Sequence, residues 1–101
     1  MKAILIDSQA RSVEGVEITG KDDIENFIGY DTLTSDELDD SGDRLFLDEE
    51  CFIRGASGRF QIDRWAPVSG RAVITGSVGA GGVQADVSTT PEKIAERVTW
   101  L

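Results

Sequence analysis

The chain has 101 residues, a single cysteine, no histidine and a formal net charge of −9 at pH 7. A chain of this length suits one domain (1–101) that buries about two-thirds of the surface its unfolded form exposes, so an apolar core suffices without a disulfide or a structural metal. The absence of histidine excludes Ser-His and Cys-His nucleophile pairs and histidine-based zinc or iron sites.

The first third of the chain predicts a β-hairpin and one short helix. Residues 1–7 contain a continuous apolar run over 3–6 that is typical of a buried strand, and spaced apolar residues over 13–18 indicate the strand that pairs with it. A helix is predicted over 22–29, with Asp22 as its N-cap and Gly29 as the residue that ends it. Because this helix has only about two turns, it needs to pack on the sheet to be stable.

A second hairpin is predicted after a polar stretch. Residues 35–43 are almost entirely polar and indicate an irregular excursion that Leu38 anchors. Residues 44–48 and 51–54 then predict two strands joined by a turn at 49–50.

The centre of the fold is predicted over 59–78, as two strands joined by a turn. Residues 55–58 lead into this ribbon by a turn, and the apolar, β-branched run over 72–75 favours a central strand that is buried on both faces. Trp65 lies between the two strands, where it either closes one end of the core or awaits a partner. Large aromatic residues in small domains are mostly buried, which favours the first of these roles.

The end of the chain predicts a loop, a short strand and a helix. Residues 76–82 are rich in glycine and alanine and indicate a flexible loop, and 83–87 indicate the last strand. Thr90 followed by proline is a strong helix start, so we predict a helix over 91–100. Together these elements predict an α+β fold, with a mostly antiparallel sheet of five to seven strands that the two helices cover.

The charges are distributed unevenly along the chain. Residues 22–50 hold twelve acidic side chains against the lone Arg44, a net −11, whereas 51–101 hold six basic and four acidic side chains, a net +2. The acidic field repels nucleic acid and anionic membranes and attracts basic protein surfaces. We therefore expect a basic protein partner and no direct contact with nucleic acid or a membrane, while homo-oligomerisation stays open. The candidate partner-binding residues are the acidic side chains in the middle of the chain: Asp36, Glu37, Asp39, Asp40, Asp43, Asp48, Glu49 and Glu50.

An alternative places ligand binding on the arginines of the second half. Such a module would bind a phosphorylated small molecule or a nucleotide, as an oligomer. The candidate residues for this alternative are Arg54, Arg59, Arg64, Arg71 and the neighbouring Trp65. The same arginines could instead pair with the acidic half, and in a third reading the acidity serves solubility alone.

Two stretches partly mimic ligand-binding loops. Residues 37–48 match part of a calcium loop, but the acids at its first and last positions are reversed, which favours a solvated acidic turn. Residues 76–82 resemble a phosphate-binding loop but lack the following Lys-Ser/Thr pair.

Cys51 has no obvious base near it in the sequence and is expected to be a small core residue. Any hydrolysis would rest on carboxylates, and nothing singles out a catalytic pair, so we expect no enzyme, no metal and no cofactor.

Several stretches together resemble a family of short domains of unknown function that phages, plasmids and other mobile elements carry. They are MKAILID, NFIGY, RLFLDEECFIRG and GRFQIDRWAPVSGRAVITG, within about residues 1–78. The shared motifs are structural: an apolar first strand, a glycine-terminated helix, an acidic hairpin turn and a strand of the pattern AG/SG-R-x-x-x-x-G. The acidic insertion over 34–43 and the last helix depart from the family pattern. The resemblance brings no catalytic residues and implies an accessory protein of a mobile element.

The leading hypothesis joins this context to the charge. The acidic residues would dock on the nucleic-acid-binding surface of a host defence or regulatory protein and compete with the nucleic acid as a DNA mimic, as anti-CRISPR or anti-restriction proteins do. Residues 1–20 lack the basic start and the long apolar stretch of a signal peptide, and the longest apolar runs are too short to span a bilayer. We therefore expect the protein to act in the host cytoplasm.

Overall fold

Strand β7 (Arg71–Thr75) lies at the centre of the fold, in a computed structural model that describes residues 1–55 and 57–101. It is the middle strand of a five-stranded antiparallel sheet with the order β2-β1-β7-β4-β3. The other strands of this sheet are β1 (Lys2–Asp7), β2 (Ser12–Glu17), β3 (Leu33–Glu37) and β4 (Arg44–Asp48). The α+β fold, the N-terminal hairpin and the central strand buried on both faces are confirmed.

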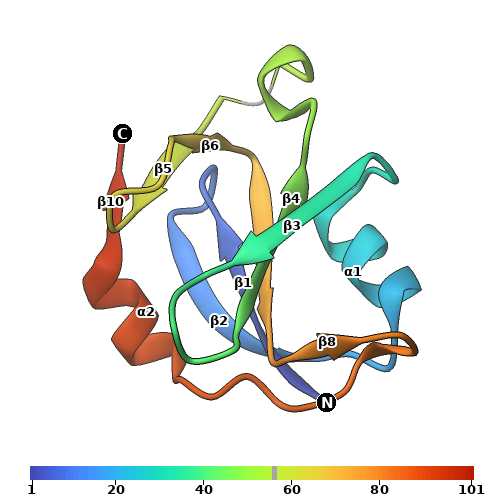
Figure 1. Cartoon of the computed structure of the whole chain (residues 1–101). Coiled ribbons are helices and arrows are strands. Elements are labelled where there is room, and N and C mark those ends of the chain that lie inside the picture. Colours follow the sequence, from blue (N-terminus) through green and yellow to red (C-terminus); the bar gives the residue numbers. More distant parts are fainter. Residues whose placement is uncertain (56) are drawn as a thin grey trace.

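Different layers cover the two faces of this sheet. Helix α1 (Lys21–Ile28) packs on one face, and helix α2 (Pro91–Arg97) lies on the other, together with a three-stranded sheet of order β10-β5-β6. Figure 1 shows the two helices on opposite sides of the five-stranded sheet. The strands of the smaller sheet are β5 (Arg59–Ile62), β6 (Val68–Ser69) and β10 (Val98–Trp100).

The alternation of side chains along β1 supplies both cores. Ile4 and Ile6 pack in the core that contains Phe60 of β5, whereas Leu5 packs in the core that contains Ile24 of α1. Successive side chains of a strand point to opposite faces, so a strand that is apolar at consecutive positions needs a layer on each side.

The ribbon predicted over 59–78 forms, but it changes sheets at Gly70. Phe60 of β5 lies opposite Val68 of β6, and beyond Gly70 the chain enters the five-stranded sheet as β7. Gly70 has a φ of 81°, in the left-handed region that glycine adopts without strain. Trp65 closes the core at the turn of the ribbon, since it packs against the buried cluster and its Nε1 donates to the Leu38 carbonyl at 3.4 Å.

The prediction of a strand over 51–54 is wrong. Cys51–Ile53 forms a 3₁₀ turn, η1, because β4 already pairs with β3 on one edge and with β7 on the other, so that no edge is left for a further strand. The strand that forms a hairpin with β4 is instead β3. It includes residues 35–37, which were predicted to belong to an irregular stretch.

The predicted C-terminal helix ends at Arg97. Its start is confirmed, because the Thr90 hydroxyl oxygen accepts a hydrogen bond from the Lys93 amide at 3.2 Å. Residues 98–100 leave the helix as β10 and pair with β5, and the Trp100 ring meets Phe60 edge-on, with 6.4 Å between the ring centroids. Pairing with the edge of β5 and this aromatic contact outweigh the helical spacing of apolar residues.

Three smaller differences concern the start of one helix, one loop and the length of one strand. Helix α1 begins after Gly20 rather than at Asp22, although Gly29 ends it with a φ of 93° as predicted. The predicted loop over 76–82 contains a small hairpin of β8 (Val78–Gly79) and β9 (Gly82–Val83), and the strand predicted over 83–87 is limited to Val83. The predicted turn over 55–58 includes Ala56, which lies outside the described residues.

Side-chain contacts cover the β3 edge of the five-stranded sheet. At β3, the Arg44 guanidinium donates to the Ser35 carbonyl at 3.2 Å, and the Asp36 carboxylate accepts from the Glu37 amide at 2.8 Å. These two contacts occupy backbone groups that a further strand would need, so the β3 edge is protected against strand addition.

We predict that Ile74→Ala in β7 lowers the free energy of unfolding by about 3 kcal/mol, because it leaves a cavity at a fully buried site. Ile53→Ala removes the same atoms from a side chain that is 76% exposed and should change stability by less than about 0.5 kcal/mol. Urea unfolding of the two variants measures both values. Equal losses would contradict the placement of these residues.

Candidate protein-binding surface

Two of the acidic candidate residues are buried. Asp43 and Asp48 are each 2% exposed, which corrects the predicted binding set, because a buried carboxylate presents no surface to a partner. Asp43 accepts hydrogen bonds from the Ser88 amide at 3.0 Å and from the Ser88 hydroxyl at 2.8 Å. It therefore joins the turn between β3 and β4 to the segment that precedes α2.

The Asp48 carboxylate joins three segments of the chain. It accepts hydrogen bonds from the Thr32 hydroxyl, from the Glu50 amide at 3.0 Å and from Arg54 Nε at 3.0 Å. Burial by itself would raise the pKa of Asp48, but these hydrogen bonds and the nearby Arg54 charge outweigh burial and hold the pKa below its ordinary value. Asp48 is thus a charged structural residue in the folded protein.

Two further acidic candidates are held in ion pairs. Asp39 Oδ2 lies 3.2 Å from Arg97 Nη2, and the same guanidinium binds Asp63. Hydrogen bonds from Ser41, supported by Arg97, hold the pKa of Asp39 below its ordinary value. Glu50 Oε2 lies 3.4 Å from Arg54 Nη2. Arginines of the second half therefore neutralise part of the acidic segment.

Asp36, Glu37 and Asp40 stay exposed at the turn end of the β3–β4 hairpin. We call these three residues the hairpin acids. None of them takes part in an ion pair within residues 1–55 and 57–101. Glu49 is also exposed, but it lies at the opposite end of β4, roughly 17 Å away along a five-residue strand. The predicted patch therefore divides into two groups of charges.

The turn that carries the hairpin acids is held at several points. Leu38 is buried, and its amide donates to the Asp43 carbonyl at 2.9 Å. The Asp43 carboxylate is bound to Ser88, and Asp39 is bound to Arg97. The buried and paired acids therefore fix the backbone that displays the free ones.

The turn η1 exposes two large apolar side chains that the sequence did not single out. Phe52 is 53% exposed and Ile53 is 76% exposed, and η1 projects beyond the ends of the strands in Figure 1. The sequence signal for this turn was an apolar run of only three residues between an acidic turn and a glycine-containing turn, because such a run is short for a strand. Cys51 at its start is buried, so the predicted role of this cysteine as a small core residue is confirmed.

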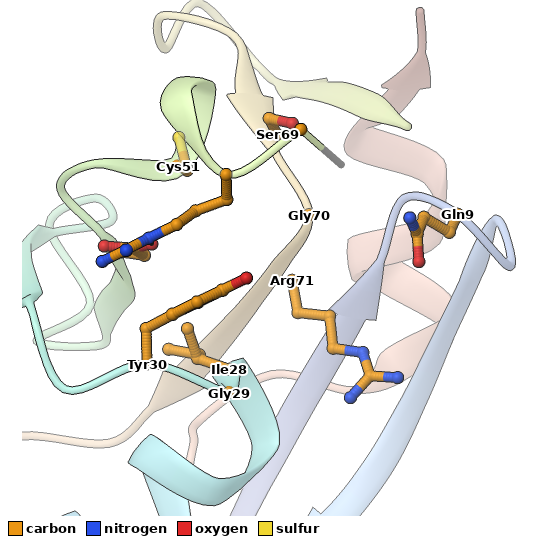
Figure 2. A pocket seen from close by; sticks show the side chains of 11 residues that line it. Gln9, Ile28, Gly29, Tyr30, Cys51, Ser69, Gly70 and Arg71 are labelled. Carbon is orange, nitrogen blue, oxygen red and sulfur yellow. The ribbon is translucent and has the colours of Figure 1, made fainter. Parts of the chain in front are cut away.

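Two of the candidate arginines line one cavity of about 380 Å³. Arg54 and Arg71 lie on its wall with Tyr30 and Cys51, and Figure 2 shows the Arg71 side chain directed away from Tyr30. Arg71 Nε lies 3.1 Å from Asp7 Oδ2, and Arg71 Nη1 donates to the Phe27 carbonyl at 3.3 Å. Because Arg54 and Arg71 already bind carboxylates of the protein, an anionic ligand would have to displace these carboxylates.

The remaining residues of the ligand alternative lie elsewhere. The Arg59 guanidinium lies 5.2 Å from the centroid of the Phe52 ring, and Arg64 is exposed in the turn after β5. Trp65 packs against the core. Neither Arg59, Arg64 nor Trp65 lines the cavity, so the structure does not bring the five residues together. Binding of a phosphorylated small molecule stays a prediction.

The positions of the partial calcium loop do not converge on one point. Asp39 contacts Arg97 and Asp43 contacts Ser88, whereas Asp48 lies at the other end of β4 and contacts Arg54. Within the described part of the chain, no group of three or more Cys, Asp or Glu side chains is arranged to hold a metal ion.

No family model, curated protein or solved structure matches this chain. The resemblance to domains of mobile elements therefore stays a prediction. Across residues 1–55 and 57–101, none of the helices has the length and apolar character needed to cross a membrane.

We predict that Asp48→Asn lowers the free energy of unfolding by about 2 kcal/mol at pH 7, because the buried hydrogen bonds lose a charged acceptor. A carboxyl whose folded-state pKa is depressed stabilises the fold above its unfolded pKa of about 4, and this stability is lost as the pH falls through the folded pKa. The difference between wild type and variant should therefore shrink below about pH 4. Urea unfolding of both proteins at a series of pH values measures this difference in the free energy of unfolding.

The matched control for this prediction is Glu49→Gln, which changes an exposed neighbouring acid in the same way. It should leave stability within about 0.5 kcal/mol of wild type. A pH-independent loss in Asp48→Asn would mean that the charge of Asp48 does not stabilise the fold.

Proposed function

We propose that this protein is a binding module, without catalytic activity, that docks on a basic, nucleic-acid-binding surface of a host protein and competes with the nucleic acid. The observation that carries the proposal is the display of the hairpin acids, which are exposed and outside the ion pairs of the described residues. The formal net charge of −9 adds a long-range field of the same sign.

The fold supports this role by holding the charged turn in place. Leu38, Asp39 and Asp43 tie the turn to the core, to Arg97 and to Ser88. A partner then loses less binding free energy to the ordering of this loop than it would with a flexible acidic tail. The carboxylates take the place of phosphates as partners of lysine and arginine side chains.

The proposed mode of action is competition by charge. Carboxylates on the hairpin would occupy the lysine and arginine side chains that otherwise contact the phosphates of a nucleic acid. Such electrostatic association is fast at low salt and weakens as salt screens the charges. The resemblance to proteins of mobile elements suggests that the partner belongs to a defence or regulatory system of the host cell.

The test is displacement of a labelled DNA duplex from purified DNA-binding proteins: a restriction endonuclease, a guide-RNA nuclease and a histone-like nucleoid protein. We expect the wild-type protein to release the duplex from at least one of them, with an apparent affinity that falls about tenfold between roughly 50 and 200 mM salt. Fluorescence anisotropy of the duplex measures the release.

The hairpin variant for this assay is Asp36→Asn/Glu37→Gln/Asp40→Asn. We expect it to lose about tenfold in apparent affinity and to depend less on salt. The matched control is Glu14→Gln/Glu92→Gln/Glu96→Gln, which removes the same number of charges from exposed positions on β2 and α2. Equal losses in the two variants would show that only bulk charge matters, and no release from any of the three proteins would contradict the proposal.

A further inference from the structure

The turn η1 holds Phe52 and Ile53 in solvent by its own geometry. A 3₁₀ turn has three residues per turn, so when Cys51 points into the core the next two side chains face away from it. The Ile53 amide donates to the Glu50 carbonyl at 3.1 Å, which closes the turn. The two apolar side chains are thus displayed by a defined backbone.

Both ends of η1 are fastened to the same buried carboxylate. Asp48 accepts from the Glu50 amide before the turn and from Arg54 Nε after it, each at 3.0 Å. The Arg59 guanidinium lies over one face of the Phe52 ring, which limits the motion of that ring. The apolar residues are therefore presented in a fixed position, at little cost in ordering on binding.

The aromatic character of the patch extends beyond η1. The Arg54 guanidinium lies 4.1 Å from the centroid of the Tyr30 ring, and Tyr30 is 41% exposed. Aromatic residues with arginine, surrounded by polar groups, are the composition of residues that dominate binding in protein interfaces.

The charges around η1 indicate what kind of surface can cover it. Asp31 and Glu49 are exposed and lie close together, because the Glu49 amide donates to the Thr32 carbonyl at 2.9 Å. The Arg54 charge is balanced by Asp48 and Glu50, which leaves Arg59 as the opposing charge beside the patch. A second copy of the chain would place like carboxylates against each other, whereas a basic partner would complement them.

We infer that Phe52 and Ile53 are the apolar anchors of the docking surface and insert into an apolar depression on the basic partner, with lysine or arginine side chains at its rim that meet Asp31 and Glu49. This inference rests on the proposed function and names the centre of its interface. The two residues are called the η1 anchors.

The η1 anchors and the hairpin acids are close enough to share one interface. They lie beyond opposite ends of β4, whose five residues span roughly 17 Å, in a molecule whose longest dimension is 33 Å. A standard interface covers on the order of 800 Å² on each partner and is therefore about 30 Å across. The anchors would then slow dissociation, while the hairpin acids steer association.

The test uses the displacement assay with the DNA-binding protein from which the wild-type chain releases the duplex. We expect Phe52→Ala/Ile53→Ala to lose about tenfold or more in apparent affinity and to keep the salt dependence of the wild type, because no charge is removed. The matched control is Val78→Ala/Leu101→Ala, which shortens two other exposed apolar side chains and should lose less than about threefold. Urea unfolding should show wild-type stability for both variants, since all four side chains are exposed.

Each other outcome overturns the inference. If Phe52→Ala/Ile53→Ala keeps the apparent affinity of the wild type while the hairpin variant loses affinity, the proposed function stands but Phe52 and Ile53 are not its anchors. Equal losses in the anchor variant and its control would show a nonspecific apolar effect. Sedimentation of a wild-type dimer that Phe52→Ala/Ile53→Ala dissociates would assign the patch to a second copy. Failure of the wild type to release DNA from any of the proteins would remove the proposed function and this inference with it.

Discussion

The hydrogen bonds of the buried Asp48 carboxylate are the interaction on which the candidate surface depends. A carboxylate that is 2% exposed destabilises a fold unless donors satisfy it. Here the donors come from Thr32 before β3, from Glu50 at the start of η1 and from Arg54 after it. One side chain therefore fastens the end of β4 both to the preceding strand and to the following turn, and so positions the η1 anchors.

The acidic residues of one short segment have two opposite roles. Asp39, Asp43 and Asp48 bind Arg97, Ser88 and Arg54 and hold the backbone in place. The hairpin acids take part in no ion pair of the described chain, so their charge is available at the surface. The structural acids reduce the number of free charges but give the remaining ones a fixed arrangement, which is more selective than a diffuse negative field.

The side-chain contacts at the β3 edge of the sheet limit how a partner can bind. The contacts of Arg44 and Asp36 at β3 occupy backbone groups to which a further strand would add. Recognition of a partner by strand addition at β3 is therefore disfavoured, and in the proposed complex the exposed side chains of the hairpin and of η1 carry the contact. Such an interface combines charges at its periphery with a small apolar centre, as protein interfaces commonly do.

The amino-acid sequence by itself determined the elements whose signal is local. The apolar run of β1, the β-branched run of β7, the glycine after α1 and the Thr90 cap of α2 each specify their own backbone, and the structure confirms them. The buried role of Cys51 was also evident, because a lone cysteine with no nearby base is usually a core residue.

Only the tertiary structure decided which polar residues are buried and which apolar residues are exposed. Asp43 and Asp48 resemble the free acids in sequence, and their burial depends on Ser88, Thr32 and Arg54. Phe52 and Ile53 face solvent because β4 already has a partner strand on each edge, so that 51–54 cannot pair with it. Residues 98–100 form a strand because β5 has an edge with which they can pair. These outcomes depend on segments far apart in the chain, which local patterns do not encode.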